Sequence, residues 1–254
     1  MKAGDHCDIY FLFGDFSHDD QVARREFQVR IVQPPRDNLN EDLPEEVLRF
    51  YAGFYLKFPE LFASLKGTER LFLGPVVDSI SVLRCPVEHA EELALFARIL
   101  GREFGVTIFD PVCDYFHRPD GFEGIAMTVE DQPVFFSPNS DQIYRSVNSM
   151  TARGGPSFLI LDADSGNYAQ VAGGDGKFTC ECREVSGESF QHWVAGRRTK
   201  ATGTIRIRTN GFHVVVNSNE RLSAADVTSI LDDFARGQSR SQKWTWRDVT
   251  DQFN

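Results

Sequence analysis

The chain has 254 residues, of which 41% are hydrophobic and 25% charged, values typical of a globular protein with one large domain or two ordinary ones. No apolar run reaches the ~20 residues of a membrane-spanning helix, and residues 1–8 lack a signal-peptide core. We therefore expect a cytoplasmic protein without a membrane partner. The five cysteines are odd in number and scattered, unlike a disulfide framework.

The negative charge is confined to one half of the chain. Residues 1–130 carry 23 acidic and 13 basic residues, whereas residues 131–254 carry 14 of each, so the first half holds the net charge of −10. Such a surface repels nucleic-acid phosphates and favours a basic partner, and it also serves solubility. We expect no nucleic-acid partner.

The first half mixes strand and helix patterns. The apolar run at 9–13 predicts a buried strand, and alternating apolar residues at 27–31 predict a second strand. A helix is predicted from Pro44 to Phe58, because its apolar residues recur at helical spacing behind an acidic first turn. Pro59 then predicts a kink or a second short helix.

A β-α-β pattern follows. Strands are predicted at 79–83 and 106–109, on either side of a helix that begins at Pro86 and ends at Gly105. A crossover of this length suits neighbouring strands of one sheet.

The segment 119–140 is rich in glycine and proline and is predicted to be a linker. Asp141 is expected to cap a short helix that ends near Met150. Residues 157–218 then show strand after strand and predict a continuous antiparallel meander, whose last hairpin turns at Asn210-Gly211.

The end of the chain predicts a helix and a strand. Ser223 and Asp226 have the spacing of a capping box, and Gly237 is expected to end the helix that they begin. Trp244 and Trp246 fall on one face of a possible final strand, where we expect them to cover the sheet edge rather than form an exposed patch with Arg247.

These patterns predict an α+β protein of two domains. Residues 1–118 form an acidic α/β-sandwich-like domain, residues 119–140 a linker, and residues 141–254 an antiparallel β-meander packed with helices.

Metal and phosphate sites are not predicted. Cys180 and Cys182 fall on the same face of a strand, but without a second pair they are expected to be small buried residues rather than metal ligands. The glycine-rich run 173–177 lies between two strands and lacks the P-loop ending, so a hairpin loop is expected. We predict no cofactor and no metal.

The sequence also holds no recognisable catalytic motif. Ser157, His192 and Asp162 are a conceivable triad, but a chain of this length offers such triples by chance. Glu181 and Glu184 are three apart on a strand and therefore on opposite faces, which favours ion pairing over joint acid–base work. We predict no catalytic residue.

One group of carboxylates is a candidate binding site. It is the densest negative group of the chain, and we call it the acidic cluster. It consists of Asp37, Glu41, Asp42, Glu45 and Glu46. Its ordinary interpretation is a solvated loop and helix start; the functional one is a contact surface for a basic protein, where opposite charge speeds encounter.

Three runs in the second half resemble immunity proteins of bacterial polymorphic toxin systems. They are Tyr168-Ala169-Gln170, the run 176–184 (GKFTCECRE) and the run 246–250 (WRDVT). The run 104–111 (FGVTIFDP) is similar to an element of α+β proteins from such loci.

The resemblance implies a non-catalytic protein that binds and neutralises a cognate toxin, delivered by a contact-dependent or type VI secretion apparatus and active in the cytoplasm. Nucleases, NAD-consuming enzymes, ADP-ribosyltransferases and deaminases all qualify, and the acidic first half favours a basic toxin. Two alternatives stay open: an enzyme-type immunity factor, such as a hydrolase that reverses a toxin modification, and a general protein-interaction adaptor.

Overall fold

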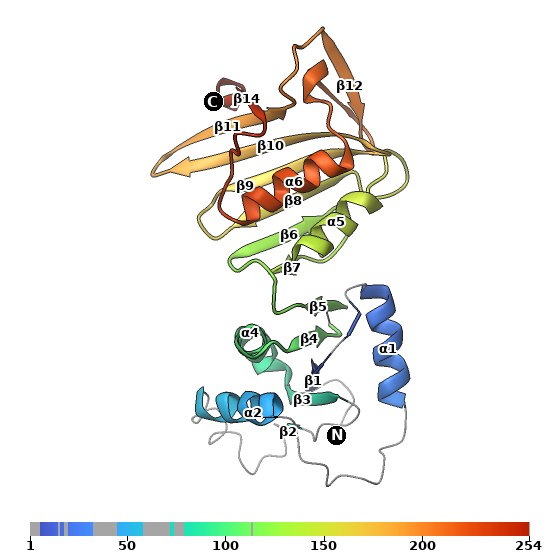
Figure 1. The fold of residues 1–254 in the computed structure, drawn as a ribbon, viewed down its shortest axis with the longest axis vertical. Coiled ribbons are helices and arrows are strands. Elements are labelled where there is room, and N and C mark those ends of the chain that lie inside the picture. Colours follow the sequence, from blue (N-terminus) through green and yellow to red (C-terminus); the bar gives the residue numbers. More distant parts are fainter. Residues whose placement is uncertain are drawn as a thin grey trace. The chain divides into compact units, whose positions relative to one another are not determined.

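The computed structural model describes residues 6–14, 16–17, 20–32, 45–57, 72–73, 79–112 and 114–253. The chain is an α+β protein whose contacts divide it into two compact units, Met1–Gly121 and Phe122–Asn254 (Figure 1). Among the described residues, no helix combines the length and the apolar character needed to cross a membrane.

The first unit contains a five-stranded antiparallel sheet in the order β2-β3-β1-β4-β5. Its strands are β1 (His6–Leu12), β2 (Phe72–Leu73), β3 (Ile80–Pro86), β4 (Thr107–Asp110) and β5 (Tyr115–His117). Its helices are α1 (Asp20–Val32), α2 (Glu45–Lys57), the 3-10 turn η1 (Val87–His89) and α4 (Ala90–Phe104).

Helices cover both faces of this sheet. Successive residues of β1 point to opposite sides and therefore contribute to two separate cores. Phe11 packs with Phe50 of α2 and Leu93 of α4 in one core. Leu12 belongs to a second core with Phe27 of α1. The first unit is therefore a helix–sheet–helix sandwich.

Two elements of the first unit differ from the prediction. Residues 27–31 lie in helix α1, where Phe27 is buried one turn after Ala23 while Val29 and Ile31 are exposed. Strands β3 and β4 are not neighbours, because β1 pairs antiparallel with both and lies between them. Gly105 does end helix α4, with the left-handed φ of 71° that glycine tolerates. The second helix predicted beyond Pro59 lies outside the described residues.

The second unit is built on a seven-stranded antiparallel sheet in the order β14-β11-β10-β9-β8-β6-β7. Its strands are β6 (Ile125–Val129), β7 (Phe135–Phe136), β8 (Phe158–Ala163), β9 (Tyr168–Gly174), β10 (Lys177–Ser186), β11 (Ser189–Gly196) and β14 (Thr245–Asp248). A separate two-stranded ribbon contains β12 (Thr204–Arg208) and β13 (His213–Asn217). Short 3-10 turns follow at η2 (Ser218–Glu220) and η3 (Thr250–Gln252).

Helices α5 (Ser140–Ser149) and α6 (Ala224–Ala235) pack on one face of the large sheet (Figure 1). Their buried residues Ile143, Val147 and Ile230 share a core with Leu161 and Val171 of the sheet. We call the opposite side the polar face, because it carries Gln170, Glu181, Arg183, His192 and Arg247.

The segment predicted as a linker contributes two strands to this sheet. In β6, Ile125, Met127 and Val129 are buried and alternate with half-buried Ala126 and Thr128. This period of two is a strand signal that the surrounding glycines and prolines obscured.

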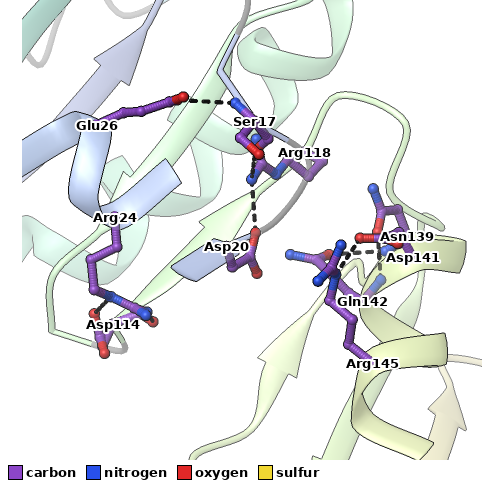
Figure 2. Close-up of polar contacts among 10 residues, drawn as sticks. All are labelled: Ser17, Asp20, Arg24, Glu26, Asp114, Arg118, Asn139, Asp141, Gln142 and Arg145. Atoms are coloured by element: carbon purple, nitrogen blue, oxygen red, sulfur yellow. Dashed lines mark hydrogen bonds and ion pairs between the residues drawn. The ribbon is translucent and has the colours of Figure 1, made fainter. Parts of the chain in front are cut away.

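The meander is confirmed for β8 to β11, which are neighbours in chain order. The last hairpin is confirmed, because β12 and β13 pair with each other around Asn210-Gly211. Its place in a continuous meander is wrong, because the two strands lie outside the large sheet and β14 occupies the place beside β11. The cap of α5 is Asn139 rather than Asp141: Asn139 Oδ1 accepts from Gln142 N–H at 2.9 Å, while Asp141 pairs with Arg145 (Figure 2). The capping box at Ser223 is confirmed.

Candidate functional site

The acidic cluster falls largely outside the described residues, which include neither Asp37, Glu41 nor Asp42 nor the side chain of Glu46. Glu45 begins α2, is exposed, and accepts a 2.5 Å hydrogen bond from Arg49 one turn later. Exposed pairs of this kind contribute ~0.3–0.5 kcal/mol. The cluster therefore stays a prediction as a partner-binding surface.

The conceivable triad is not assembled. Ser157 Oγ donates to Glu130 Oε2 at 2.9 Å and accepts from the Asn210 N–H at 2.9 Å. The strand register leaves β9 and β10 between Asp162 on β8 and His192 on β11. Ser157 thus ties the β12–β13 connection to the sheet. It lies just before β8, at the opposite end of that strand from Asp162.

Cys180 and Cys182 are fully buried on the helix-covered side of β10, as predicted for small core residues. The hydrogen bond with Cys182 and burial raise the pKa of the Cys180 thiol well above its ordinary value. Among the described residues, no three His, Cys, Asp or Glu side chains are grouped to hold a metal ion.

The glycine-rich run forms the β9–β10 hairpin, as predicted. Gly173 has a φ of 134°, and a Cβ there would come within 2.2 Å of the Lys177 carbonyl oxygen. The glycine is therefore required by the close approach of two backbones rather than by a phosphate.

A row of residues crosses four neighbouring strands on the polar face. The register places Gln170 of β9 opposite Glu181 of β10, Glu181 opposite Val194 of β11, and Val194 opposite Arg247 of β14. Glu181 Oε2 accepts from Gln170 Nε2 at 2.7 Å and contacts His192 Nε2 at 2.9 Å. An ionised carboxylate can only accept, so Nε2 of the imidazole carries the hydrogen.

His192 is enclosed on every side that the structure describes. Its ring stacks on Phe253 with centroids 4.1 Å apart and meets the edge of Tyr168 at 5.8 Å. The Thr250 hydroxyl accepts from its backbone N–H at 3.0 Å. Its Nδ1 is buried and has no hydrogen-bond partner among the described residues. The His192 side chain is 1% exposed, so access to this nitrogen requires neighbouring groups to move.

The row continues into an ion pair whose carboxylate is buried. Arg247 donates to both carboxylate oxygens of Glu220, at 2.6 and 2.9 Å, and the Glu220 side chain is 3% exposed. Burial alone would raise the pKa of Glu220, but hydrogen bonds from Arg247 and Asn217 lower it below the ordinary value. Glu181 and Glu220 are therefore already hydrogen-bonded within the unit.

Aromatic rings flank the arginine of β10. The Arg183 guanidinium lies 4.0 Å from the centre of the Phe190 ring and 5.8 Å from that of Tyr168. Glu184 points to the opposite face, as predicted, and accepts from Ser239 and Arg240. The ion pairing expected of the two carboxylates is present at Glu184, which pairs with Arg240 at 2.9 Å. Glu181 instead accepts from the Gln170 amide and contacts His192.

The tryptophans near the end of the chain cover the sheet, as expected. Trp244 and Trp246 pack against the core, and Trp246 Nε1 donates to the Ser241 carbonyl at 3.1 Å. Arg247 points to the other face and binds Glu220, so the three side chains form no shared patch.

A buried arginine anchors helix α1 in the first unit. Arg118, whose side chain is 3% exposed, donates to Asp20 at 2.7 Å and to the Ser17 carbonyl at 2.8 Å (Figure 2). Arg24 of the same helix pairs with Asp114 at 2.9 Å (Figure 2). Both contacts tie α1 to the end of the sheet near β5, which gives them a structural role.

One segment of the second unit, which we did not single out from the sequence, carries exposed basic residues and no acidic ones. No acidic residue occurs between Ser189 and Asn219, although five lysines and arginines do. Four of the five lie in residues 198–217, which we call the basic ribbon. They are Arg198, Lys200, Arg206 and Arg208, all exposed and without an ion pair among the described residues. The gap in acidic residues is the sequence signal that could have found it.

The chain matches no protein-family model, no curated protein and no solved structure. Its function therefore has to be inferred from its residues and their geometry.

Proposed function

We propose that the protein is a non-catalytic immunity protein that binds and neutralises a cognate bacterial toxin acting in the cytoplasm. The proposal depends on a contrast in the second unit between buried, paired side chains and exposed basic ones. His192 and Glu220, two groups capable of acid–base chemistry, are buried and paired with neighbouring side chains. The exposed charged groups of the basic ribbon make no ion pair among the described residues.

The buried groups are badly placed for turnover. A general acid or base has to reach the proton that it transfers, directly or through one water. The His192 side chain is 1% exposed and the Glu220 side chain 3% exposed. A binding protein has no such requirement, and a satisfied polar network stiffens the sheet that presents its surface.

The runs that resemble immunity proteins also meet in space. Gln170 comes from the first run, Glu181 from the second and Arg247 from the third, and all three lie in the row across the polar face. A resemblance spread over three distant stretches thus corresponds to one surface of the second unit. This supports the proposal, because a shared surface is what a family of binding proteins would retain.

Capture of the partner tests the proposal first. The full chain is expressed in its native host with an affinity tag, and the proteins that co-purify in equal amount are identified. We expect one protein whose expression alone stops growth and whose toxicity is relieved by the chain. A stoichiometric partner without toxicity would contradict the proposal and favour an adaptor.

The stoichiometry of neutralisation tests the absence of turnover. Purified toxin is titrated with the chain while the toxin's activity is measured. A binding inhibitor abolishes the activity at one chain per toxin, whereas an enzyme acts at amounts far below stoichiometric.

One observation favours an enzyme-type immunity factor as a second candidate. The Glu181 carboxylate orients His192 while Nδ1 stays unbonded beneath Phe253, an arrangement that would present a base if the segment moved. The variant H192Q separates the candidates: an enzyme loses its protection with the toxin still bound, and a binding protein keeps both.

A further inference from the structure

The basic ribbon is held to the second unit by one face only. Ile207 and Val216 are 1% and 3% exposed, and the Asn210 N–H donates to Ser157 Oγ at 2.9 Å. Figure 1 shows β12 apart from the strands of the large sheet, and β12 and β13 pair only with each other among the described residues. The ribbon is thus a fixed projection with a second, outward face.

The outward face is set by the register of the two strands. Arg206 lies opposite Val215, and Arg208 lies opposite His213. These four side chains share one face because side chains on paired positions point the same way. All four are exposed, Val215 by 60%, and Phe212 beside them is 57% exposed.

Arg206 and Arg208 supply the positive charge that the register places on this face. Nearby Arg197 pairs with Asp226, but Arg198, Lys200, Arg206 and Arg208 make no ion pair among the described residues. The ribbon therefore keeps a cluster of one sign in a chain whose net charge is −10. Such a cluster steers an oppositely charged partner to one place on the surface.

The geometry points to an acidic, extended segment of the partner protein as the occupant of this face, and we propose that the basic ribbon binds it. Alternate residues along a strand are ~6.6–6.8 Å apart. Arg206 and Arg208 therefore match the spacing of carboxylates at alternate positions of an extended acidic chain, and Val215 and Phe212 offer apolar contact beside them.

A protein segment fits this face better than a nucleic acid. Non-specific binding to DNA grows with the number of phosphates neutralised, and proteins that make ~6–10 such contacts owe most of their affinity to them. The ribbon offers four cations, and the rest of the chain is acidic. The apolar Val215 and Phe212 of the ribbon are 60% and 57% exposed, which suits a protein surface.

The inference rests on the proposed function only in taking the partner to be a protein. It concerns a different surface from the acidic cluster, whose predicted partner surface is basic.

Peptide binding to the full chain tests the ribbon without the toxin. The probe is a blocked peptide of alternating glutamate and threonine, labelled for fluorescence anisotropy, and its comparison is the same peptide with glutamine for glutamate. We expect the glutamate peptide to bind and added salt to weaken its binding. The variant R206E/R208E should weaken it by about tenfold or more. The variant R25E/R49E changes the net charge equally at exposed sites of the first unit and should bind as the parent does.

Other outcomes would overturn the inference. Equal binding of both peptides would remove the charge argument, and unchanged binding to R206E/R208E would place the contact elsewhere. A single-stranded oligonucleotide that binds through Arg206 and Arg208 while the acidic peptide does not would assign the face to nucleic acid. Self-association abolished by R206E/R208E, again without peptide binding, would assign it to a second copy of the chain.

Toxin capture separates this inference from the proposed function. If R206E/R208E captures the toxin with unchanged affinity, the ribbon inference fails and the immunity proposal stands. If no toxin is captured but the acidic peptide binds through Arg206 and Arg208, the immunity proposal fails and the ribbon inference stands.

Discussion

Removing Arg247 should destabilise the second unit through the carboxylate that it leaves behind. In R247M the apolar stem of the side chain is kept, so the change is chiefly the loss of two hydrogen bonds and one charge. Glu220 would then be a carboxylate 3% exposed and without its cation.

The magnitude follows from the burial of the two partners. Breaking a buried ion pair by removing one member costs ~3–5 kcal/mol. Arg247 is itself 39% exposed, and Glu220 keeps the hydrogen bonds from Asn217, both of which reduce the loss. We therefore expect the free energy of unfolding to fall by about 2–3 kcal/mol.

Urea unfolding followed by tryptophan fluorescence isolates this unit, since all three tryptophans, at 193, 244 and 246, lie within it. With an m-value of about 2 kcal/mol/M, the midpoint should fall by about 1–1.5 M. The control K243M removes a cation that is 63% exposed and 3.3 Å from Asp233, and it should change the free energy by less than ~0.5 kcal/mol.

The effect should also depend on pH, because the folded pKa of Glu220 lies below its ordinary value. Its contribution is present above the unfolded pKa and is lost as pH falls through the folded pKa. In R247M the carboxyl protonates more readily, so the difference between the two proteins should shrink toward acidic pH. Equal midpoints for R247M and K243M, or a difference that is constant from neutral to acidic pH, would refute the reasoning.

Three further predictions follow from other parts of the chain. G173A should lower the free energy of unfolding by more than about 2 kcal/mol, because its Cβ would meet the Lys177 backbone; G187A, which has open space around it, should lose only about 1 kcal/mol, and equal losses would contradict the close-approach argument. A thiol reagent should leave Cys180 and Cys182 unmodified in the folded protein and label them in urea, as judged by mass spectrometry; labelling without denaturant would contradict their burial. Reversing all charges of the acidic cluster to lysine should weaken toxin binding most at low salt. A toxin that binds this variant as well as the parent, at low and at high salt, would contradict the cluster as a contact surface.

Local signals in the sequence predicted the elements whose determinants are local. The capping box at Ser223, the left-handed stop at Gly105 and the hairpins from β8 to β11 depend on residues a few positions apart. The alternating apolar residues at 27–31 predicted a strand, but they lie in helix α1. The burial of Phe27 against the sheet is what distinguishes a helix from a strand there.

The remaining errors concern long-range pairing. Strand β1, at residues 6–12, lies between β3 and β4, which occur much later in the chain. Strand β14 pairs with β11 at the edge of the large sheet, although β12 and β13 come between them in the sequence. No local pattern encodes either choice. The polar row was missed for the same reason, since Gln170, Glu181 and Arg247 become neighbours only through the register of four strands.

The ratio of chain to toxin at complete neutralisation tests the central claim most directly. With the captured toxin held at a concentration well above the dissociation constant, the account predicts that its activity falls linearly with added chain and ends at one chain per toxin, for the parent and for H192Q alike. Complete neutralisation at a small fraction of that ratio, abolished by H192Q, would contradict a binding mechanism and identify an enzyme.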